Sequence, residues 1–146
     1  MGLDAAAGLY VTMPTSYAAL VTRARTQPGE WVLVHAAAGG GECHCLSTVV
    51  LTRLSLNSST LTIAVGLAAV QIAKAIGAKV IATAGSEEKL KVAKSFGADY
   101  GINYNNEGWQ KEVMKITQGH GADVVYDPVG MIVPSLKCIA WNGRLI

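Results

Sequence analysis

Short hydrophobic runs alternate with helical patterns along almost the whole chain, and this alternation restricts the fold more than any other feature. Runs of strand length cover residues 31–35, 79–83, 100–104 and 123–126, and a fifth begins at 143. They are apolar on both faces, as is typical of strands that a parallel sheet buries on both sides. The pattern predicts right-handed βαβ units and an α/β fold, a Rossmann-like doubly wound parallel sheet.

Helical segments are expected between the strands. One spans 65–76 and ends at Gly77, which suits a helix C-terminus. Another spans 87–96, and the hydroxyl of Ser86 can cap its first turn. The remaining helices are expected at 15–25, at 109–117 and near 134–137.

The composition argues against several classes of protein. The 146 residues are 51% hydrophobic and 15% charged, which disfavours intrinsic disorder. A net charge of +2 without a basic block disfavours nucleic acid as a partner. No apolar run reaches the roughly 18 residues of a membrane span, and the N-terminus lacks the basic region of a secretory signal. Three cysteines make no disulfide framework, so we expect an intracellular, cytoplasmic protein.

The strand spacing identifies residues 41–64 as an anomalous insertion. The expected strands begin at 31, 79, 100, 123 and 143, so the later intervals are 21, 23 and 20 residues, whereas the first is 48. The stretch 41–64 contains 24 residues, with eight Ser or Thr and no Lys. Removing it shortens the first interval to 24 residues and joins Gly40 directly to Val65.

Two origins of this insertion are compatible with the sequence. Codons for residues 41–43 can contain the donor-like GTGAGT, and codons for residues 63–65 can contain an acceptor-like CAG in the same phase. The segment would then be an unspliced, in-frame intron of 72 nucleotides. The alternative is a true surface loop, which is disfavoured because it would interrupt the turn described next.

The joined sequence places a glycine-rich turn between a strand and a helix, an arrangement that can bind a dinucleotide. Such a unit needs a tight turn, close approach of the backbone to the pyrophosphate, and close packing of helix on strand. Gly39 suits the second role and Gly66 the third, whereas Ala37 stands where the first glycine is usual. Free N–H groups at the helix start would hold the phosphates. A plain glycine-rich turn is the alternative.

Further motifs accompany this turn and cover nearly all of the chain except 41–64. They are TSYAAL at 15–20, PGE at 28–30, AAAGG at 36–40 with VG at 65–66, GSEEK at 85–89, FGA at 96–98, INY at 102–104 and YDPVG at 126–130. Together they resemble the cofactor domain of the zinc-free quinone oxidoreductases (zeta-crystallin-like) of the medium-chain dehydrogenase/reductase superfamily.

The resemblance implies hydride transfer from NADPH to a small molecule, a quinone or an α,β-unsaturated carbonyl compound. It implies that Gly39, Gly40, Val65 and Gly66 approach the pyrophosphate. It further implies a homodimer paired through edge strands in the complete protein.

The resemblance also suggests NADPH contacts after the second expected strand. Ala84 stands where NAD-preferring relatives carry an acid for the ribose 2′-hydroxyl, so a 2′-phosphate would not be repelled. Ser86 and Lys89 match positions that receive this phosphate, and Tyr104 matches a tyrosine that packs over it. Thr15 matches a threonine near the nicotinamide. Helix capping is the alternative role for Ser86 and Thr15, and a solvated surface position is the alternative for Lys89.

The full family chain has a catalytic domain before this region and closing segments after it. We therefore expect a junction segment at 1–25 and a partial NAD(P)-binding Rossmann domain at 26–146, with about five strands and a sixth missing. No catalytic residue can be named. Cys43, His44 and Cys45 are too few for a tetrahedral zinc site, so no metal is expected. A catalytically inactive fragment, or a nucleotide-binding or interaction module, is the alternative function.

The intron hypothesis makes a prediction about the transcript. Sequencing the messenger RNA across codons 38–68 is expected to show Gly40 joined to Val65, with the frame continuing in both directions. Uniform retention of the 24 codons for residues 41–64 would refute the hypothesis and favour a genuine loop.

Overall fold

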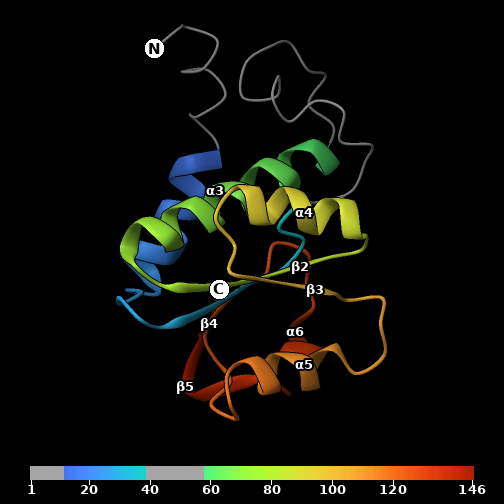
Figure 1. Ribbon diagram of the computed structural model, residues 1–146. Helices are drawn as coiled ribbons and strands as arrows, with labels where there is room; N and C mark the ends of the chain where they lie inside the picture. The colour runs from blue at the N-terminus through green and yellow to red at the C-terminus, as the bar shows by residue number, and fades with distance from the viewer. Residues whose placement is uncertain (1–11, 39–57) are drawn as a thin grey trace, which may run out of the picture.

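A computed structural model describes residues 12–38 and 58–146, with the backbone alone from 58 to 64. Five strands in this part of the chain form one parallel sheet in the order β3-β2-β1-β4-β5 (Figure 1). This is the order of the first five strands of a Rossmann fold, so the expected α/β class is confirmed. The strands are β1 (Trp31–Val34), β2 (Lys79–Ala84), β3 (Tyr100–Asn103), β4 (Ala122–Tyr126) and β5 (Ile139–Leu145).

Helices cover both faces of the sheet, which makes the fold doubly wound. Figure 1 shows α3 and α4 on one side of the strands and α5 and α6 on the other. A helix that begins at residue 12 precedes β1, and its second half is the π-helix η1. The elements are η1 (Ala18–Arg23), α3 (Ser58–Ile76), α4 (Glu87–Ser95), α5 (Trp109–Ile116) and α6 (Ile132–Ser135).

The start of α3 differs from the sequence-based prediction. A helix was expected from Val65, but α3 begins at Ser58. Residues 58–64, which were assigned to the insertion, therefore form its first turns. The stretch between Ser58 and Val65 contains neither Gly nor Pro, and adding residues to an existing helix is far easier than nucleating one. The remainder of the insertion, 41–57, lies outside the described residues.

The fifth strand also begins earlier than predicted, at Ile139 instead of Gly143. Its pairing with β4 is irregular, because Ala122 pairs with Ile139 whereas Val124 pairs with Arg144. The extra residues form a bulge in which Asn142 has a positive φ of 62°. A bulge breaks the two-residue alternation that identifies a strand in a sequence, so only the part after it was recognised.

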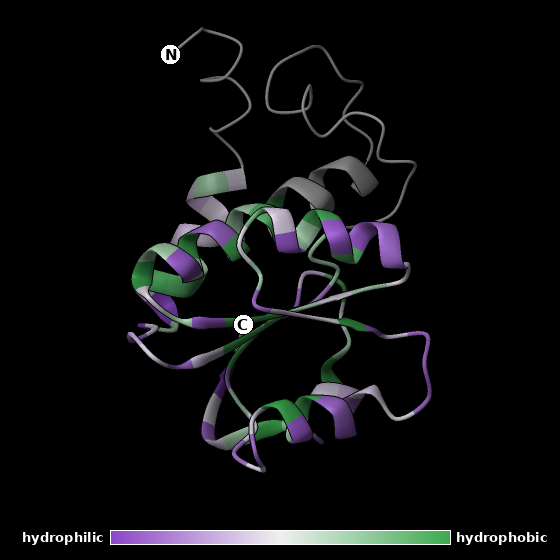
Figure 2. Cartoon of the chain, in the orientation of Figure 1, coloured by the Kyte–Doolittle hydropathy of each residue, from purple (hydrophilic) through white to green (hydrophobic). Residues whose placement is uncertain are grey.

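Two hydrophobic clusters form the core, one on each face of the sheet. Val32 and Val34 point into the cluster beneath α3 and α4, whereas Leu33 points into the cluster beneath α5. Successive residues of a strand face opposite sides of a sheet, so one strand contributes to both clusters. Figure 2 shows hydrophobic residues along the central strands and on parts of α3 and α5. Within the described residues, no helix is long and apolar enough to cross a membrane.

The turn before β4 provides a test of the packing between β4 and β5. A Cβ on Gly121 would lie 2.8 Å from Ala140 N, and φ there is +89°. We predict that Gly121→Ala lowers the free energy of unfolding by about 3 kcal/mol, since overpacking adds to left-handed strain. Gly119→Ala is the matched control, with φ of +87° but open space around it, and is expected to cost about 1 kcal/mol.

Urea titrations of the two variants measure the difference. Equal losses would show that the close approach of Gly121 to β5 does not constrain the sheet.

Candidate functional site

The candidate site is the crevice at the carboxyl ends of β1 and β4. The chain runs from β1 outward through β2 to β3, then returns to β4 on the other side of β1. In open α/β sheets, ligands bind where the strand order reverses in this way. The segments that follow the two strands, 35–38 and 127–131, therefore flank the expected ligand position.

Gly66 packs α3 against the turn that follows β1. A Cβ at this position would lie 2.8 Å from Ala36 O and 2.9 Å from Ala37 Cα, both backbone atoms. This is the close packing of helix on strand that was expected of the third glycine in a dinucleotide-binding turn. Gly39 and Gly40 lie outside the described residues.

The amide groups of Val65 and Gly66 do not lie at the start of a helix, and this corrects the sequence-based hypothesis. Because α3 begins at Ser58, both residues lie in its interior. In an α-helix each N–H beyond the first turn donates to the carbonyl four residues earlier. The two amides are therefore already paired, and they are not the free N–H groups expected to hold a pyrophosphate.

The second group of predicted residues lies after β2, where the structure brings three of them together. A Cβ on Gly85 would lie 2.9 Å from Tyr104 Oη, so the tyrosine lies directly over this glycine. Ser86 is the N-cap of α4, and its hydroxyl accepts a hydrogen bond from Lys89 N at 3.5 Å. β2 ends at Ala84, a buried residue without charge.

Asn105 belongs to the same group but was missed in the sequence. Its side-chain amide donates to Gly85 O at 2.9 Å, which ties the end of β3 to the end of β2. Its position directly after the expected third strand was the available signal.

Thr15, the remaining predicted residue, is exposed on the helix that precedes β1. Its neighbour Ser16 is fully buried and donates to Val65 O at 2.9 Å. The Tyr126 hydroxyl lies 3.4 Å from Ser16 Oγ, and burial raises the pKa of this tyrosine. Ser16 thus connects the first helix with α3 and with the end of β4.

His35 is fully buried at the end of β1 and has a partner at each ring nitrogen. Nδ1 lies 2.9 Å from Thr83 Oγ1, and Nε2 lies 2.8 Å from Ser135 Oγ. Trp109 packs edge-on against the ring, with the centroids 5.3 Å apart. Burial lowers the pKa of His35 to about 4 despite the opposing charge of Asp127, so the ring is neutral at pH 7.

Asp127 shapes the segment after β4. Its Oδ1 accepts hydrogen bonds from Val129 N at 3.2 Å and from Gly130 N at 2.9 Å. This turn orders the wall of the crevice opposite the segment that follows β1. The other carboxylate oxygen, Oδ2, is buried and has no hydrogen-bond partner.

The described residues contain no group of three or more His, Cys, Asp or Glu side chains that could hold a metal ion. Cys43, His44 and Cys45 lie outside these residues. Cys138 is fully buried, and burial raises the pKa of its thiol to about 11, which makes it a packed thiol and a poor nucleophile.

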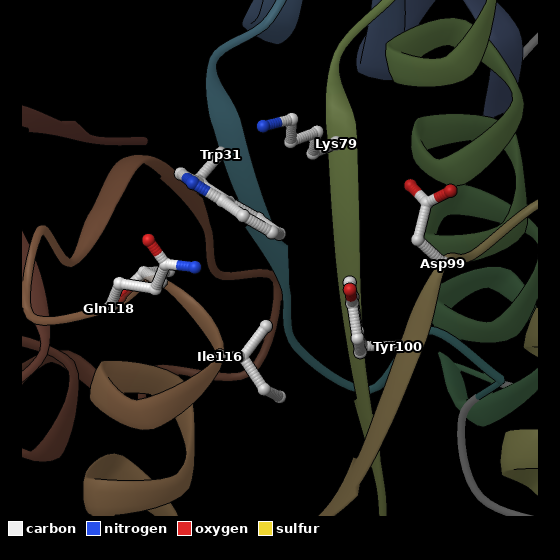
Figure 3. A pocket seen from close by; sticks show the side chains of 7 residues that line it. Trp31, Lys79, Asp99, Tyr100, Ile116 and Gln118 are labelled. Carbon is white, nitrogen blue, oxygen red and sulfur yellow. The ribbon is translucent and has the colours of Figure 1, made fainter.

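A cavity of about 410 Å³ opens at the opposite edge of the sheet, near the amino ends of the strands (Figure 3). The ring centroids of Trp31 and Tyr100 lie 5.8 Å apart, and Lys79 Nζ lies 4.9 Å from the Trp31 ring. Because ligands of doubly wound sheets bind at the carboxyl ends, this cavity is not the dinucleotide crevice. It is lined by Trp31, Lys79, Asp99, Tyr100, Ile116, Thr117 and Gln118.

Comparison with known protein families agrees with the fold. A family model described as zinc-binding dehydrogenase matches residues 64–146, more than half of the chain. The chain therefore belongs to this NAD(P)-dependent family of dehydrogenases and reductases. More specifically, the chain is a quinone oxidoreductase-like member of the medium-chain dehydrogenase/reductase superfamily. It covers the cofactor domain of such proteins.

Individual relatives support this assignment. The quinone oxidoreductase-like protein 2 homolog of Nematostella vectensis is 38% identical over 144 residues, which cover 97% of this chain and 33% of the relative. Among solved structures, an NAD-dependent alcohol dehydrogenase is 37% identical with a TM-score of 0.80, covering 99% of this chain and 36% of that one. The CurK enoyl reductase is 35% identical with a TM-score of 0.76, covering 99% and 37%. The chain thus spans about a third of the length of these relatives.

The burial of His35 makes the free energy of unfolding depend on pH. Its pKa is 6.5 in the unfolded chain and about 4 in the folded one, so between these values the unfolded chain binds a proton that the folded chain excludes. We predict that the free energy of unfolding falls as the pH drops from 6.5 to 4, with a contribution from His35 of roughly 3 kcal/mol.

Urea titrations from about pH 7 to about pH 4 measure this loss. His35→Gln is expected to remove that part of the pH dependence, and the control His120→Gln, at a more exposed histidine bonded to Asp123, is expected to retain it. Identical pH profiles for native protein and His35→Gln would contradict the prediction.

Proposed function

We propose that this chain is the cofactor domain of an NADPH-dependent reductase whose complete form acts on a quinone or an α,β-unsaturated carbonyl compound. The cofactor would supply a hydride, and the residues of this chain would bind and orient it. The names of the relatives, which include quinone oxidoreductases and enoyl reductases, support both substrate classes. A homodimer paired through edge strands remains part of the proposal.

The end of β2 carries the preference for NADPH over NADH. β2 ends at the uncharged Ala84, so that residue offers no carboxylate that would accept a hydrogen bond from a ribose 2′-hydroxyl or repel a 2′-phosphate. Lys89 lies in the first turn of α4, where its ammonium group and the helix N-terminus both favour an anion. Tyr104 lies over Gly85 and would pack against the adenosine.

The pyrophosphate is accommodated less well than the adenosine. The amides of Val65 and Gly66, which would face the phosphates at a helix start, are paired inside α3. This favours the second candidate in the form of an interaction module without catalytic activity. The two candidates differ in whether removal of residues 41–64 restores tight binding.

Titration of NADPH and NADH tests both candidates. We predict that a variant with Gly40 joined to Val65 binds NADPH at least tenfold more tightly than the chain of 146 residues, because α3 would then begin at free amides. In that variant, Lys89→Glu is expected to weaken NADPH binding by about 10- to 100-fold, the size of a lost charge-assisted hydrogen bond, and to leave NADH binding unchanged.

Lys91→Glu is the matched control, since Lys91 is exposed on the same helix two residues further on. An equal effect of the two substitutions would remove Lys89 from the site. Failure of both chains to bind either nucleotide would favour an interaction module and overturn the proposed function.

A further inference from the structure

The hydrogen bonds around His35 fix which ring nitrogen carries the proton. Ser135 Oγ donates its only proton to Met131 O at 2.6 Å, because a carbonyl can only accept. Ser135 Oγ can therefore only accept from His35, so Nε2 carries the hydrogen. A neutral imidazole has one N–H, so Nδ1 is an acceptor and the Thr83 hydroxyl donates to it.

These bonds connect four separate parts of the chain. His35 N donates to Tyr126 O at 3.0 Å, which extends the pairing of β1 with β4 beyond the strand ends. The ring reaches Thr83 on β2 in one direction and Ser135 on α6 in the other. Ser135 in turn reaches Met131, the last residue of the crevice segment 127–131.

The three side chains that form these hydrogen bonds are shielded from water. His35, Thr83 and Ser135 are each fully buried, and Trp109 covers an edge of the imidazole. A buried polar group that loses its partner is costly, so each member holds its neighbours in place. α6 has only four residues, and its exposed side chains Ile132 and Val133 give it little burial of its own.

We propose that His35 is a positioning residue that, as the Nε2–H tautomer, holds α6 and the segment 127–131 at the carboxyl ends of β1 and β2 and so sets one wall of the crevice. The Asp127 turn orders this segment from within, and His35 attaches it to the sheet. That a dinucleotide lies against this wall rests on the proposed function. The positioning itself does not.

Nitrogen-15 NMR of the imidazole in the whole chain reads the tautomer directly. The expected spectrum at pH 7 has a protonated Nε2 and an unprotonated Nδ1. A protonated Nδ1, or a mixture of the two tautomers, would overturn the proposal.

Hydrogen exchange in the same chain measures how firmly α6 and the segment 127–131 are held in place. Ser135→Ala and Thr83→Val are expected to speed exchange of the amides of Val129 and Gly130, and those of α6, by at least tenfold. Exchange in β2 and α4 is expected to remain unchanged. Thr83→Ser, which keeps the hydroxyl, is expected to restore the native rates, and Ser95→Ala is the control, since its hydroxyl bonds to a backbone carbonyl on the exposed side of α4.

The pattern of exchange separates positioning from general stability. Uniformly faster amide exchange throughout the sheet would mean that the bonds of His35 only stabilise the fold. Unchanged exchange would mean that α6 and the segment 127–131 keep their position without these bonds, and this would overturn the proposal. Titration of NADPH against the same variants, made in the form with Gly40 joined to Val65, then tests the proposed function separately. Local acceleration without a change in affinity leaves His35 as a positioning residue and removes the dinucleotide from this wall.

Discussion

The burial of β1 on both faces is the constraint on which the rest of the structure depends. β1 pairs with β2 on one side and β4 on the other, and Val32, Leu33 and Val34 are all fully buried. Each such side chain contributes roughly 2 kcal/mol through removal from water. Because β1 cannot shift without exposing one of the two core clusters, its carboxyl end is a fixed point from which the turn 35–38 and His35 are positioned.

The crevice beside β1 combines a rigid wall with an altered helix start. On one side, Thr83, His35 and Ser135 form a directional series of buried hydrogen bonds. On the other side, α3 begins at Ser58, so the amides of Val65 and Gly66 form hydrogen bonds inside the helix and are not free to bind a phosphate. The same preference for continued helical hydrogen bonding that stabilises α3 thus competes with anion binding at this position.

Much of the fold could be predicted because its signals are local. The apolar runs of β1, β2 and β4, and the cap at Ser86, are visible within a few residues of sequence. The predictions were wrong where a local signal was missing or misleading. α3 begins earlier because no Gly or Pro stops it after Ser58, and β5 begins earlier because a bulge interrupts its pattern.

The sequence by itself determined the class of fold, the uncharged end of β2 and the glycine at position 66, because these follow from residue type and spacing along the chain. Only the tertiary structure decided the relations between distant residues. Thr83 lies 48 positions from His35 and Ser135 lies 100, yet both bond to the same ring. A proton position that depends on two such partners cannot be predicted from spacing, since it exists only after the sheet has brought the strand ends together.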